Sequence, residues 1–484
     1  MSSNTTPTQK LRVLLIPYFA TSHIQPFTEL AIRLAVANNA VDATMAVTPA
    51  NVSIVQSLLE DRGQQHNVKI ATYPFPRVEG IPEGLENLGK ASSAEDAIRM
   101  DLAAISEDLT RPAQETLIRA QSPDAIVTDM LFSWNARVAD EVGGVPCVTF
   151  CVMGAFSMLA VRHLAEEVGN DDAVRVVPGF PDPPVRIPRA ELPEFLRVHD
   201  YSFNTWFNKL QADCFGLAMN TSSDLEKQYC EIYTRQGYVK RAYFLGPLAL
   251  QPSSSAEQKE EEEEKKKKKK KCGIMDWLDS KPNHSVVYLS FGTIAHVKDS
   301  QLDEIALGLE SSRVSFLWVV RGKHWSPPVG WEERVQDRGF IIRAWAPQTA
   351  ILGHPAVGAF VTQCGWNSIL ETVAAGVPVL TWPLFYEQFI TERQVTQVLG
   401  IGERLWPEGA GLRSESFQEN EVVPAQDVAR ALTSFMRPGG GGDAARIKVM
   451  DLSAKAHAAV APGGSSHQDL HRLLHDLMAD RRST

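Results

Sequence analysis

Short runs of apolar, mostly β-branched residues recur along almost the whole chain, and longer stretches with helical periodicity separate them. This alternation is typical of βαβ units, in which helices connect parallel strands and pack on the sheet. In the first half we expect strands near 12–17, 43–48, 68–72, 125–128, 146–150 and 216–219, with a helix near 27–38. The second half restarts the pattern, with strands expected near 285–291, 316–320, 339–342, 357–362 and 377–380. We therefore predict an α/β fold with two similar doubly wound domains.

One low-complexity segment, residues 251–272, separates the two series of strands. It contains five glutamates, 260–264, followed by seven lysines, 265–271. Because these charges cancel locally and Glu precedes Lys at helical spacing, we interpret the segment as a solvated linker rather than a basic interaction tail. The expected organisation is a first domain over 1–250, the linker over 251–272, a second domain over 273–456 and a helical tail over 457–484. A hinge of this kind usually places a ligand in the cleft between the lobes.

Charge and composition narrow the class of partner. The 484 residues include 48 Lys and Arg against 58 Asp and Glu, and the net charge of −10 argues against nucleic acid or an anionic membrane. The six cysteines form no Cys-x-x-Cys pair, so neither a disulfide framework nor a metal site is indicated. No apolar run approaches the roughly 18 residues of a membrane span, and the polar N-terminus lacks a secretory pattern. We expect a cytoplasmic, monomeric protein with small-molecule partners and no metal.

The first strand ends in a segment that carries a histidine instead of a glycine-rich turn. Residues 18–23 read Tyr-Phe-Ala-Thr-Ser-His, without the G-x-G-x-x-G of dinucleotide-binding enzymes. The strand near 125–128 ends similarly, in Asp129. Taken alone, His23 fits a loop residue and Asp129 fits a helix cap. Because the carboxyl ends of parallel strands meet at one crevice, the two together predict a general base and the carboxylate that orients it.

The most informative segment is the run of 44 residues from Trp345 to Gln388. Within it, a buried strand over 357–362 leads through the turn 363–368 into a helix. Small residues at a helix N-terminus form an anion site, so a phosphate is the expected guest. Around this turn, Trp345 suits the face of an aromatic base and Gln348 suits its edge. Glu371 suits ribose hydroxyls, and Glu387 with Gln388 suits vicinal sugar hydroxyls.

This segment resembles the 44-residue signature of plant family 1 glycosyltransferases, which use UDP-sugars to glycosylate small acceptors. The resemblance extends over the chain: LLIPYFATSHIQP resembles the family's opening strand with its catalytic histidine, TDMLFSW its acidic partner, FLGPL the end of the first domain and SFGT a phosphate-side loop. It implies the GT-B fold, two facing Rossmann-like domains with a cleft between them. The first domain would bind mainly the acceptor and the second the UDP-sugar, and the tail helix would return to the first domain.

Carried over by position, the resemblance also implies a donor site and a mechanism. The implied residues are Trp345, Ala346 and Gln348 for uracil, Glu371 for ribose, Gly292, Thr293, Gln363, Gly365, Asn367 and Ser368 for the phosphates, and Trp366, Glu387 and Gln388 for the sugar. Gln388 is the form associated with glucose rather than galactose, so UDP-glucose is the expected co-substrate and no cofactor is needed. With His23 as base and Asp129 steadying the imidazolium, a single displacement inverts the anomeric centre and gives a β-glucoside. No metal is required, because the helix dipole and fixed donors stabilise the leaving diphosphate.

Two positions depart from the family pattern. At the start of the 363–368 turn relatives have histidine and this chain has Gln363, which forfeits a charge-assisted hydrogen bond worth roughly 1.5–3 kcal/mol. We therefore expect weaker or altered donor use. Around Val152 and Met153 the chain is apolar where relatives often have Ser or Thr, which leaves UDP-rhamnose as an alternative donor.

The first domain is rich in aromatic and Met residues, which favour a flat apolar acceptor such as a flavonoid or another phenol. The candidates for its pocket are Phe132, Trp134, Phe150, Met153, Phe156 and Phe203, each of which also fits plain core packing. Glycosylation of an acceptor hydroxyl is the leading interpretation, and C-glycosylation by the same His–Asp pair is an alternative. A non-catalytic binder with this fold is a further alternative, which the presence of both His23 and Asp129 disfavours.

Overall fold

The computed structural model describes residues 10–38, 40–63, 67–91, 93–167, 172–197, 212–250, 273–292, 297–320, 325–414 and 419–481. The chain divides into two compact units. Unit 1 comprises Met1–Ala155, Ser202–Ala249 and Pro462–Thr484, and unit 2 comprises Phe156–Tyr201 and Leu250–Ala461. Unit 2 thus takes in Phe156–Tyr201, a segment that the sequence pattern assigns to the first domain. The charged linker 251–272 lies outside the described residues.

Unit 1 is built on a seven-stranded sheet in which all described strand pairs are parallel. The strands are β1 (Leu11–Ile16), β2 (Val41–Val47), β3 (Lys69–Thr72), β4 (Ala125–Asp129), β5 (Cys147–Cys151), β8 (Gly216–Met219) and β9 (Ala242–Phe244). Their order is β3-β2-β1-β4-β5-β8-β9, so the direction of winding reverses between β1 and β4. A ligand crevice is expected at the carboxyl ends of the strands at such a reversal.

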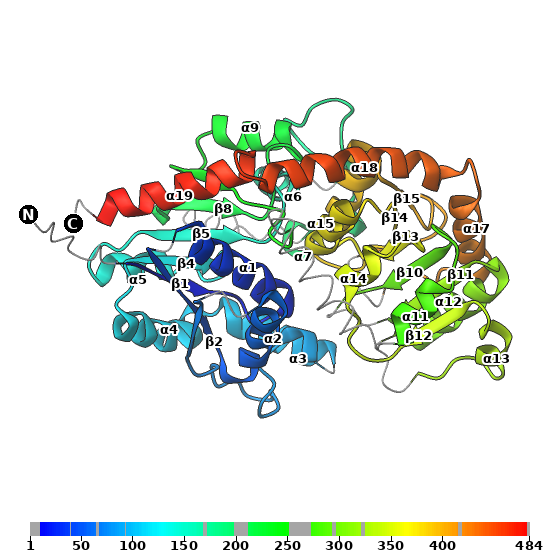
Figure 1. Ribbon diagram of the computed structural model, residues 1–484, viewed down its shortest axis with the longest axis horizontal. Coiled ribbons are helices and arrows are strands. Elements are labelled where there is room, and N and C mark those ends of the chain that lie inside the picture. Colours follow the sequence, from blue (N-terminus) through cyan, green and yellow to red (C-terminus); the bar gives the residue numbers. More distant parts are fainter. Residues whose placement is uncertain are drawn as a thin grey trace, which may run out of the picture. The chain divides into compact units, whose positions relative to one another are not determined.

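Helices accompany the sheet of unit 1. They are α1 (Thr21–Ala37), α2 (Val52–Arg62), α3 (Ala94–Ile105), α4 (Glu107–Gln121), α5 (Asn135–Glu141), α9 (Lys227–Arg235) and α19 (Ser465–Arg481), with short 3-10 turns η1 (Pro49–Asn51) and η2 (Leu88–Lys90). Phe27 and Leu30 of α1 share one core cluster with Leu473 of α19. The α19 helix, red in Figure 1, is also tied to β9, because Asp469 accepts from the Phe244 backbone N–H at 2.7 Å.

Unit 2 contains a second parallel sheet, with six strands in the order β12-β11-β10-β13-β14-β15. The strands are β10 (Val286–Ser290), β11 (Ser315–Val319), β12 (Gly339–Ile342), β13 (Val357–Thr362), β14 (Val379–Thr381) and β15 (Gly402–Arg404). Here the winding reverses between β10 and β13. A separate antiparallel hairpin joins β6 (Val174–Val176) to β7 (Arg186–Pro188).

Helices also accompany the second sheet. They are α6 (Ala155–Glu166), whose first residue belongs to unit 1, α7 (Glu194–Arg197), α11 (Gly273–Asp279), α12 (Asp299–Ser312), α13 (Trp331–Val335), α14 (Gln348–Leu352), α15 (Trp366–Ala375), α16 (Gln388–Arg393), α17 (Ala425–Met436) and α18 (Gly441–Val460), with the 3-10 turn η3 (Arg189–Glu191). After α16 the chain continues as a π-helical segment, η4 (Gln394–Leu399). Such segments are rare and are frequently found at functional sites.

The long apolar runs predicted the strands well, and short or polar elements were missed. Every expected strand is present within a few residues, but β9 and β15, three residues each, and the β6–β7 hairpin were not predicted. The α1 helix begins at Thr21, six residues before the expected start, so His23 lies in a helical first turn and not in a loop. The apolar periodicity of α1 becomes regular only from Phe27 onward, which left no signal for its first turn.

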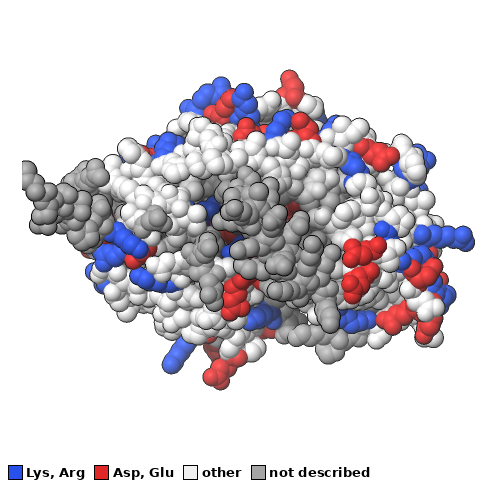
Figure 2. Space-filling model, in the orientation of Figure 1, with Lys and Arg blue, Asp and Glu red and all other residues white. Residues whose placement is uncertain are grey.

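Charges of both signs are interspersed over the face shown in Figure 2, where the described Lys and Arg side chains lie among Asp and Glu without forming one continuous patch. No helix among the described residues is long and apolar enough to span a membrane.

Candidate active site

The first site lies at the reversal point of the unit 1 sheet and joins the two residues expected there. His23 stands in the first turn of α1, after β1, and Asp129 is the last residue of β4. The Nδ1 atom of His23 lies 2.8 Å from Oδ2 of Asp129. The histidine side chain is 19% exposed and the aspartate is fully buried. A buried carboxylate that holds Nδ1 leaves Nε2 available to take a proton from a bound molecule.

Asp129 is itself held in place by the backbone. Its Oδ2 atom accepts from the Tyr18 N–H at 3.2 Å, and its Oδ1 atom accepts from the Leu131 N–H at 3.1 Å. With His23, the carboxylate therefore has three partners around it, which is the arrangement that keeps a buried charge in one orientation.

Tyr18 completes the surroundings of the histidine. Its ring meets that of His23 edge to face, with centroids 5.0 Å apart, and its hydroxyl donates to Asp101 of α3. Sequence reasoning did not assign it a role. An aromatic residue directly at the end of β1, five positions before the histidine, was the available signal.

The second site lies at the reversal point of the unit 2 sheet, where β10 and β13 end. Gly292 follows β10 with a φ of +76°, and Cys364 follows β13 with a φ of +70°. The positive φ at Gly292 favours glycine, and an added Cβ would lie 2.2 Å from Nε2 of Gln363, so a side chain there would displace this amide. The predicted phosphate-side loop and the predicted phosphate turn are therefore in contact; Thr293 lies outside the described residues.

The amide of Gln363 is oriented by its neighbour. The Thr362 hydroxyl donates to Oε1 of Gln363 at 3.1 Å, which turns Nε2 towards Gly292 and Gly365. No described residue accepts a hydrogen bond from this Nε2. The turn leads directly into α15, which begins at Trp366, so a neutral donor stands beside a helix N-terminus. This geometry suits an anion such as a diphosphate.

The nucleoside candidates form a connected group on α14 and α15. Nε2 of Gln348 donates to Oε2 of Glu371 at 2.6 Å and to Oγ of Ser368 at 3.1 Å. Oε1 of Gln348 accepts from the Tyr288 hydroxyl at 3.3 Å, a partner that the sequence did not reveal. Trp345 is 60% exposed, an unusual position for so large an apolar ring. An exposed indole beside amide and carboxylate groups can stack on a base.

The sugar candidates lie at the start of α16. Gln388 is 6% exposed, and its Oε1 accepts from the backbone N–H groups of Leu384 at 3.1 Å and Phe385 at 3.3 Å. Its Nε2 has no partner among the described residues. Glu387 immediately precedes it as the helix cap. Trp366, by contrast, is only 4% exposed, so its indole supports α15 from within and offers little open surface.

The aromatic acceptor candidates are mostly closed into the core. Phe132, Trp134, Phe150 and Phe156 are each at most 2% exposed, and Met153 is partly exposed. Phe132 packs against Tyr18, the residue whose ring meets His23, with centroids 6.3 Å apart. Phe203 lies outside the described residues. Core packing, the other interpretation open for each residue, accounts for the four buried rings.

Other chemistry is not indicated around these sites. Burial raises the pKa of the Cys364 thiol well above its usual value, so this residue in the turn stays a neutral thiol and serves packing. Among the described residues no group of three or more His, Cys, Asp or Glu side chains is arranged to hold a metal ion.

Comparison with known proteins shows which family the chain resembles. The family model described as "UDP-glucoronosyl and UDP-glucosyl transferase" matches residues 203–405. UDP-glucosyl transferase 73CC6 of Saponaria officinalis is 34% identical over 496 residues, which cover 97% of this chain and 97% of the relative. The anthocyanin 3'-O-beta-glucosyltransferase of Gentiana triflora is 33% identical over 488 residues, which cover 97% of this chain and 98% of the relative.

A solved structure agrees with the whole-chain match. The crystal structure of Glycyrrhiza uralensis UGT73P12, complexed with glycyrrhetinic acid 3-O-monoglucuronide, superposes with a TM-score of 0.81 at 30% identity. The match covers 97% of this chain and 96% of that one. The similarity therefore spans both units and is not confined to the 345–388 segment.

Proposed function

The chain belongs to the plant family 1 UDP-glycosyltransferases, and on that basis we propose that it transfers glucose from UDP-glucose to a hydroxyl of a small apolar acceptor with inversion at the anomeric carbon. Its fold is GT-B, with two Rossmann-like units, and the family uses a UDP-sugar as co-substrate without a cofactor. The observation that carries the proposal is the 2.8 Å contact between His23 and Asp129 at the reversal point of the first sheet.

In the proposed mechanism, His23 is the general base. Because Asp129 engages Nδ1, the lone pair for catalysis is on Nε2, which removes the acceptor proton as the acceptor oxygen attacks the anomeric carbon. The positive imidazolium that results faces a buried carboxylate with no other cation bonded to it among the described residues. The bond between the anomeric carbon and the diphosphate oxygen breaks in the same step, and one displacement inverts the configuration.

The leaving group is assigned to the turn between β13 and α15. The N-terminus of α15 carries a partial positive charge of about 0.5, and the Nε2 donor of Gln363 lies beside it. Gly292, Gly365, Asn367 and Ser368 are the further phosphate candidates, and Trp345, Ala346, Gln348 and Glu371 are the candidates for uridine. Glucose is the proposed sugar because Glu387 and Gln388 end the 345–388 segment, and the Saponaria and Gentiana relatives are both named as glucosyltransferases.

A flat phenolic acceptor, for example a flavonoid, is the proposed acceptor class. The Gentiana relative is named for anthocyanin, and the ring of Tyr18 against His23, with Phe132 packed on Tyr18, gives the first site apolar surroundings. We place the reaction in the cytoplasm, since none of the described cysteines forms a disulfide, and we expect the enzyme to act as a monomer.

A donor-by-acceptor screen tests the proposal. The full chain is incubated with UDP-glucose, UDP-galactose or UDP-rhamnose and a panel of phenols, and products are identified by mass spectrometry. We expect an acid-labile hexose adduct with UDP-glucose, lowered by about 10²–10⁴-fold in His23→Ala. An acid-stable adduct would indicate C-glycosylation, and preference for UDP-rhamnose would overturn the assignment of the sugar. Turnover unaffected in His23→Ala would refute the mechanism.

A further inference from the structure

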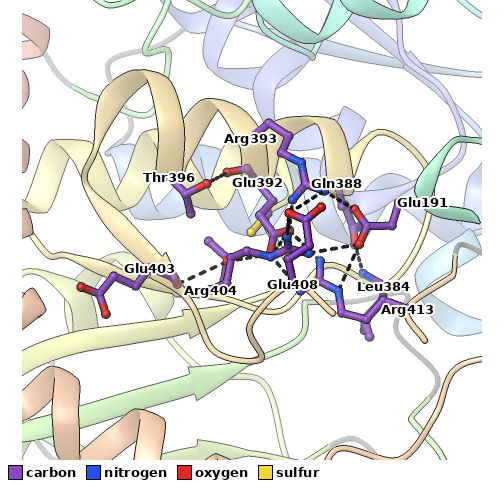
Figure 3. A network of polar contacts seen from close by, with 12 residues as sticks. Glu191, Leu384, Gln388, Glu392, Arg393, Thr396, Glu403, Arg404, Glu408 and Arg413 are labelled. Carbon is purple, nitrogen blue, oxygen red and sulfur yellow. Dashed lines mark hydrogen bonds and ion pairs between the residues drawn. The ribbon is translucent and has the colours of Figure 1, made fainter. Parts of the chain in front are cut away.

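We infer that Thr381 and Glu392 are positioning residues for the donor sugar, which aim the amide of Gln388 by clamping the segment that connects β14 to α16. This inference rests on the proposed function of Gln388. Neither residue belongs to the expected donor site, and both are fully buried. Figure 3 shows Glu392 beside Gln388, within a group of ion pairs.

The connecting segment leaves the sheet immediately after Thr381. Up to that point it is fixed by the sheet, because the Trp382 N–H donates to the Thr362 carbonyl at 2.8 Å and the Leu405 N–H donates to the Thr381 carbonyl at 3.1 Å. Pro383 then has no N–H to offer. The next two N–H groups, of Leu384 and Phe385, both donate to Oε1 of Gln388. The shape of the segment therefore depends on side chains of α16.

Two side chains of α16, one helical turn apart, hold the two ends of this segment. Gln388 binds the backbone at 384–385, and four residues later Oε1 of Glu392 accepts from the Thr381 hydroxyl at 2.7 Å. Residues at this spacing lie on the same face of a helix. If the contact between Thr381 and Glu392 is lost, α16 can shift relative to β14, and the side chain of Gln388 shifts with it.

Trp382, Pro383 and Leu384 line a cavity of about 50 Å³, although the ring of Trp382 also packs edge to face against Phe291, with centroids 5.4 Å apart. Interiors without voids resist displacement, whereas a cavity lets its wall move into it. Packing therefore leaves room for a shift on the cavity side of the segment, and the polar clamp restrains that shift.

The ion pairs around Glu392 keep it charged and immobile. Its carboxylate lies 2.6 Å from Nη2 of Arg413, 3.1 Å from Nη1 of Arg393 and 3.2 Å from Nε of Arg404. Burial acts to raise the pKa of Glu392, but the charges of Arg413 and Arg404 outweigh it and lower that pKa. The carboxylate is thus a permanent acceptor for the Thr381 hydroxyl.

The same cluster, in turn, is fastened to the hairpin segment. Glu191, the last residue of η3, accepts from Arg393 at 2.6 Å and from Arg404 at 3.0 Å (Figure 3). Arg393 also donates from Nε to the carbonyl of Arg186 in β7, at 3.0 Å. α16 is therefore anchored at its carboxyl end to the hairpin segment and, through Arg404, to β15, and the Thr381 contact joins it directly to β14.

The consequence for Gln388 is specific to the sugar. Because its Oε1 is engaged by the backbone, only Nε2 remains to donate to a sugar hydroxyl, and its direction follows the position of α16. The uridine and phosphate candidates lie in or beside other elements, namely β10, β13, α14 and α15. Disturbing the clamp should therefore weaken UDP-glucose without weakening UDP.

Thr381→Val tests the inference, because valine keeps the shape of threonine and removes the hydroxyl. Calorimetric titration of the full chain with UDP and with UDP-glucose is the measurement. We expect the affinity for UDP-glucose to fall about fivefold to tenfold, in keeping with one hydrogen bond of about 1 kcal/mol, and the affinity for UDP to change less than twofold. Thr381→Ser, which restores the hydroxyl, should recover the wild-type affinity.

Thr110→Val is the matched control. Thr110 is also fully buried, and its hydroxyl donates to the Ala103 carbonyl in unit 1 at 2.8 Å, whereas the Thr381 hydroxyl also lies 3.3 Å from the Glu403 carbonyl. It should lose similar thermal stability without a change in either affinity. Equal weakening of UDP and UDP-glucose by Thr381→Val, or no weakening of either, would overturn the inference. Failure of the wild type to bind UDP at all would instead refute the proposed function.

Discussion

Replacement of Asp129 by asparagine removes the charge of the side chain and keeps its shape. The aspartate accepts hydrogen bonds on both oxygens, from His23 and the Tyr18 N–H on one side and from the Leu131 N–H on the other. An amide can present its oxygen to only one side. If its nitrogen faces His23, Nδ1 must become the acceptor and the proton moves to Nε2, which then cannot act as base. If its oxygen faces His23, the Leu131 N–H loses its partner.

The expected loss in rate follows from the charge. With His23 Nδ1 2.8 Å from the carboxylate oxygen, the charge centres of the ion pair formed during catalysis are roughly 4 Å apart, an attraction of about 4 kcal/mol at an effective dielectric constant of about 20. A neutral hydrogen bond to the amide returns about 1 kcal/mol. The remaining 3 kcal/mol, approximately, corresponds to a kcat lower by about 10²–10³-fold.

The assay is steady-state turnover with saturating UDP-glucose and acceptor, paired with calorimetry for UDP. UDP affinity should stay unchanged in Asp129→Asn, since its proposed site is on the other sheet. Asp124→Asn is the matched control, because Asp124 also accepts from a backbone N–H, that of Arg12 at 2.9 Å, but precedes β4 at the opposite end of the strand. It should keep wild-type kcat. A kcat for Asp129→Asn within about threefold of wild type would refute the role of the carboxylate.

Three further predictions concern other parts of the chain. Gln363→His should tighten UDP binding by up to about 10²-fold at a pH where the imidazole is protonated, because a charge-assisted hydrogen bond replaces a neutral one. Calorimetry measures this change, and unchanged or weaker binding would contradict the prediction. Gly292→Ala should weaken UDP at least tenfold and lower the melting temperature, because the backbone has a φ of +76° and the new Cβ would lie 2.2 Å from Nε2 of Gln363; normal UDP binding would show that the loop is tolerant. Partial burial and neighbouring His471 lower the pKa of His467 from 6.5. The neutral form of His467 therefore stabilises α19 above about pH 6.5, and this stability is lost as the pH falls below that value. Amide exchange in the first turn of α19 should accelerate from pH 7.5 to 5.5, and it should accelerate less in His471→Gln.

The sequence was most informative where one physical requirement repeats. Strands buried on both faces must be apolar throughout, so β1, β4, β10 and β13 could be placed to within a few residues. The three-residue strands β9 and β15 are too short to show any such pattern. The pairing of His23 with Asp129 was predictable for a related reason, because the ends of parallel strands converge whatever the loops between them do.

Side-chain direction could not be predicted in the same way. Tyr288 reads as one more apolar strand residue, yet its hydroxyl reaches Gln348. Thr381 and Glu392 are eleven residues apart, and their contact depends on how α16 returns to β14, which no local periodicity encodes. The buried rings of Phe150 and Trp134 illustrate the converse, because an aromatic residue near a strand end looks the same in sequence whether it faces a pocket or the core.

Gln363, near the middle of the 345–388 segment, and Gln388, at its end, show how one arrangement can serve two tasks. In each, Oε1 is engaged by a neighbouring donor, the Thr362 hydroxyl or the backbone at 384–385, so each offers only Nε2. A primary amide fixed in this way is a neutral donor of defined direction, which gives a sugar hydroxyl or a diphosphate one hydrogen bond but no positive charge. At the phosphates, therefore, the N-terminus of α15 must carry most of the charge stabilisation, and that contribution is typically 0.3–1 kcal/mol, up to about 2 kcal/mol when partly buried. It follows that this chain should owe an unusually large share of its donor affinity to the uridine and sugar ends of UDP-glucose. Truncation of UDP-glucose to glucose 1-phosphate should therefore abolish binding more completely than it does in a relative with histidine at position 363.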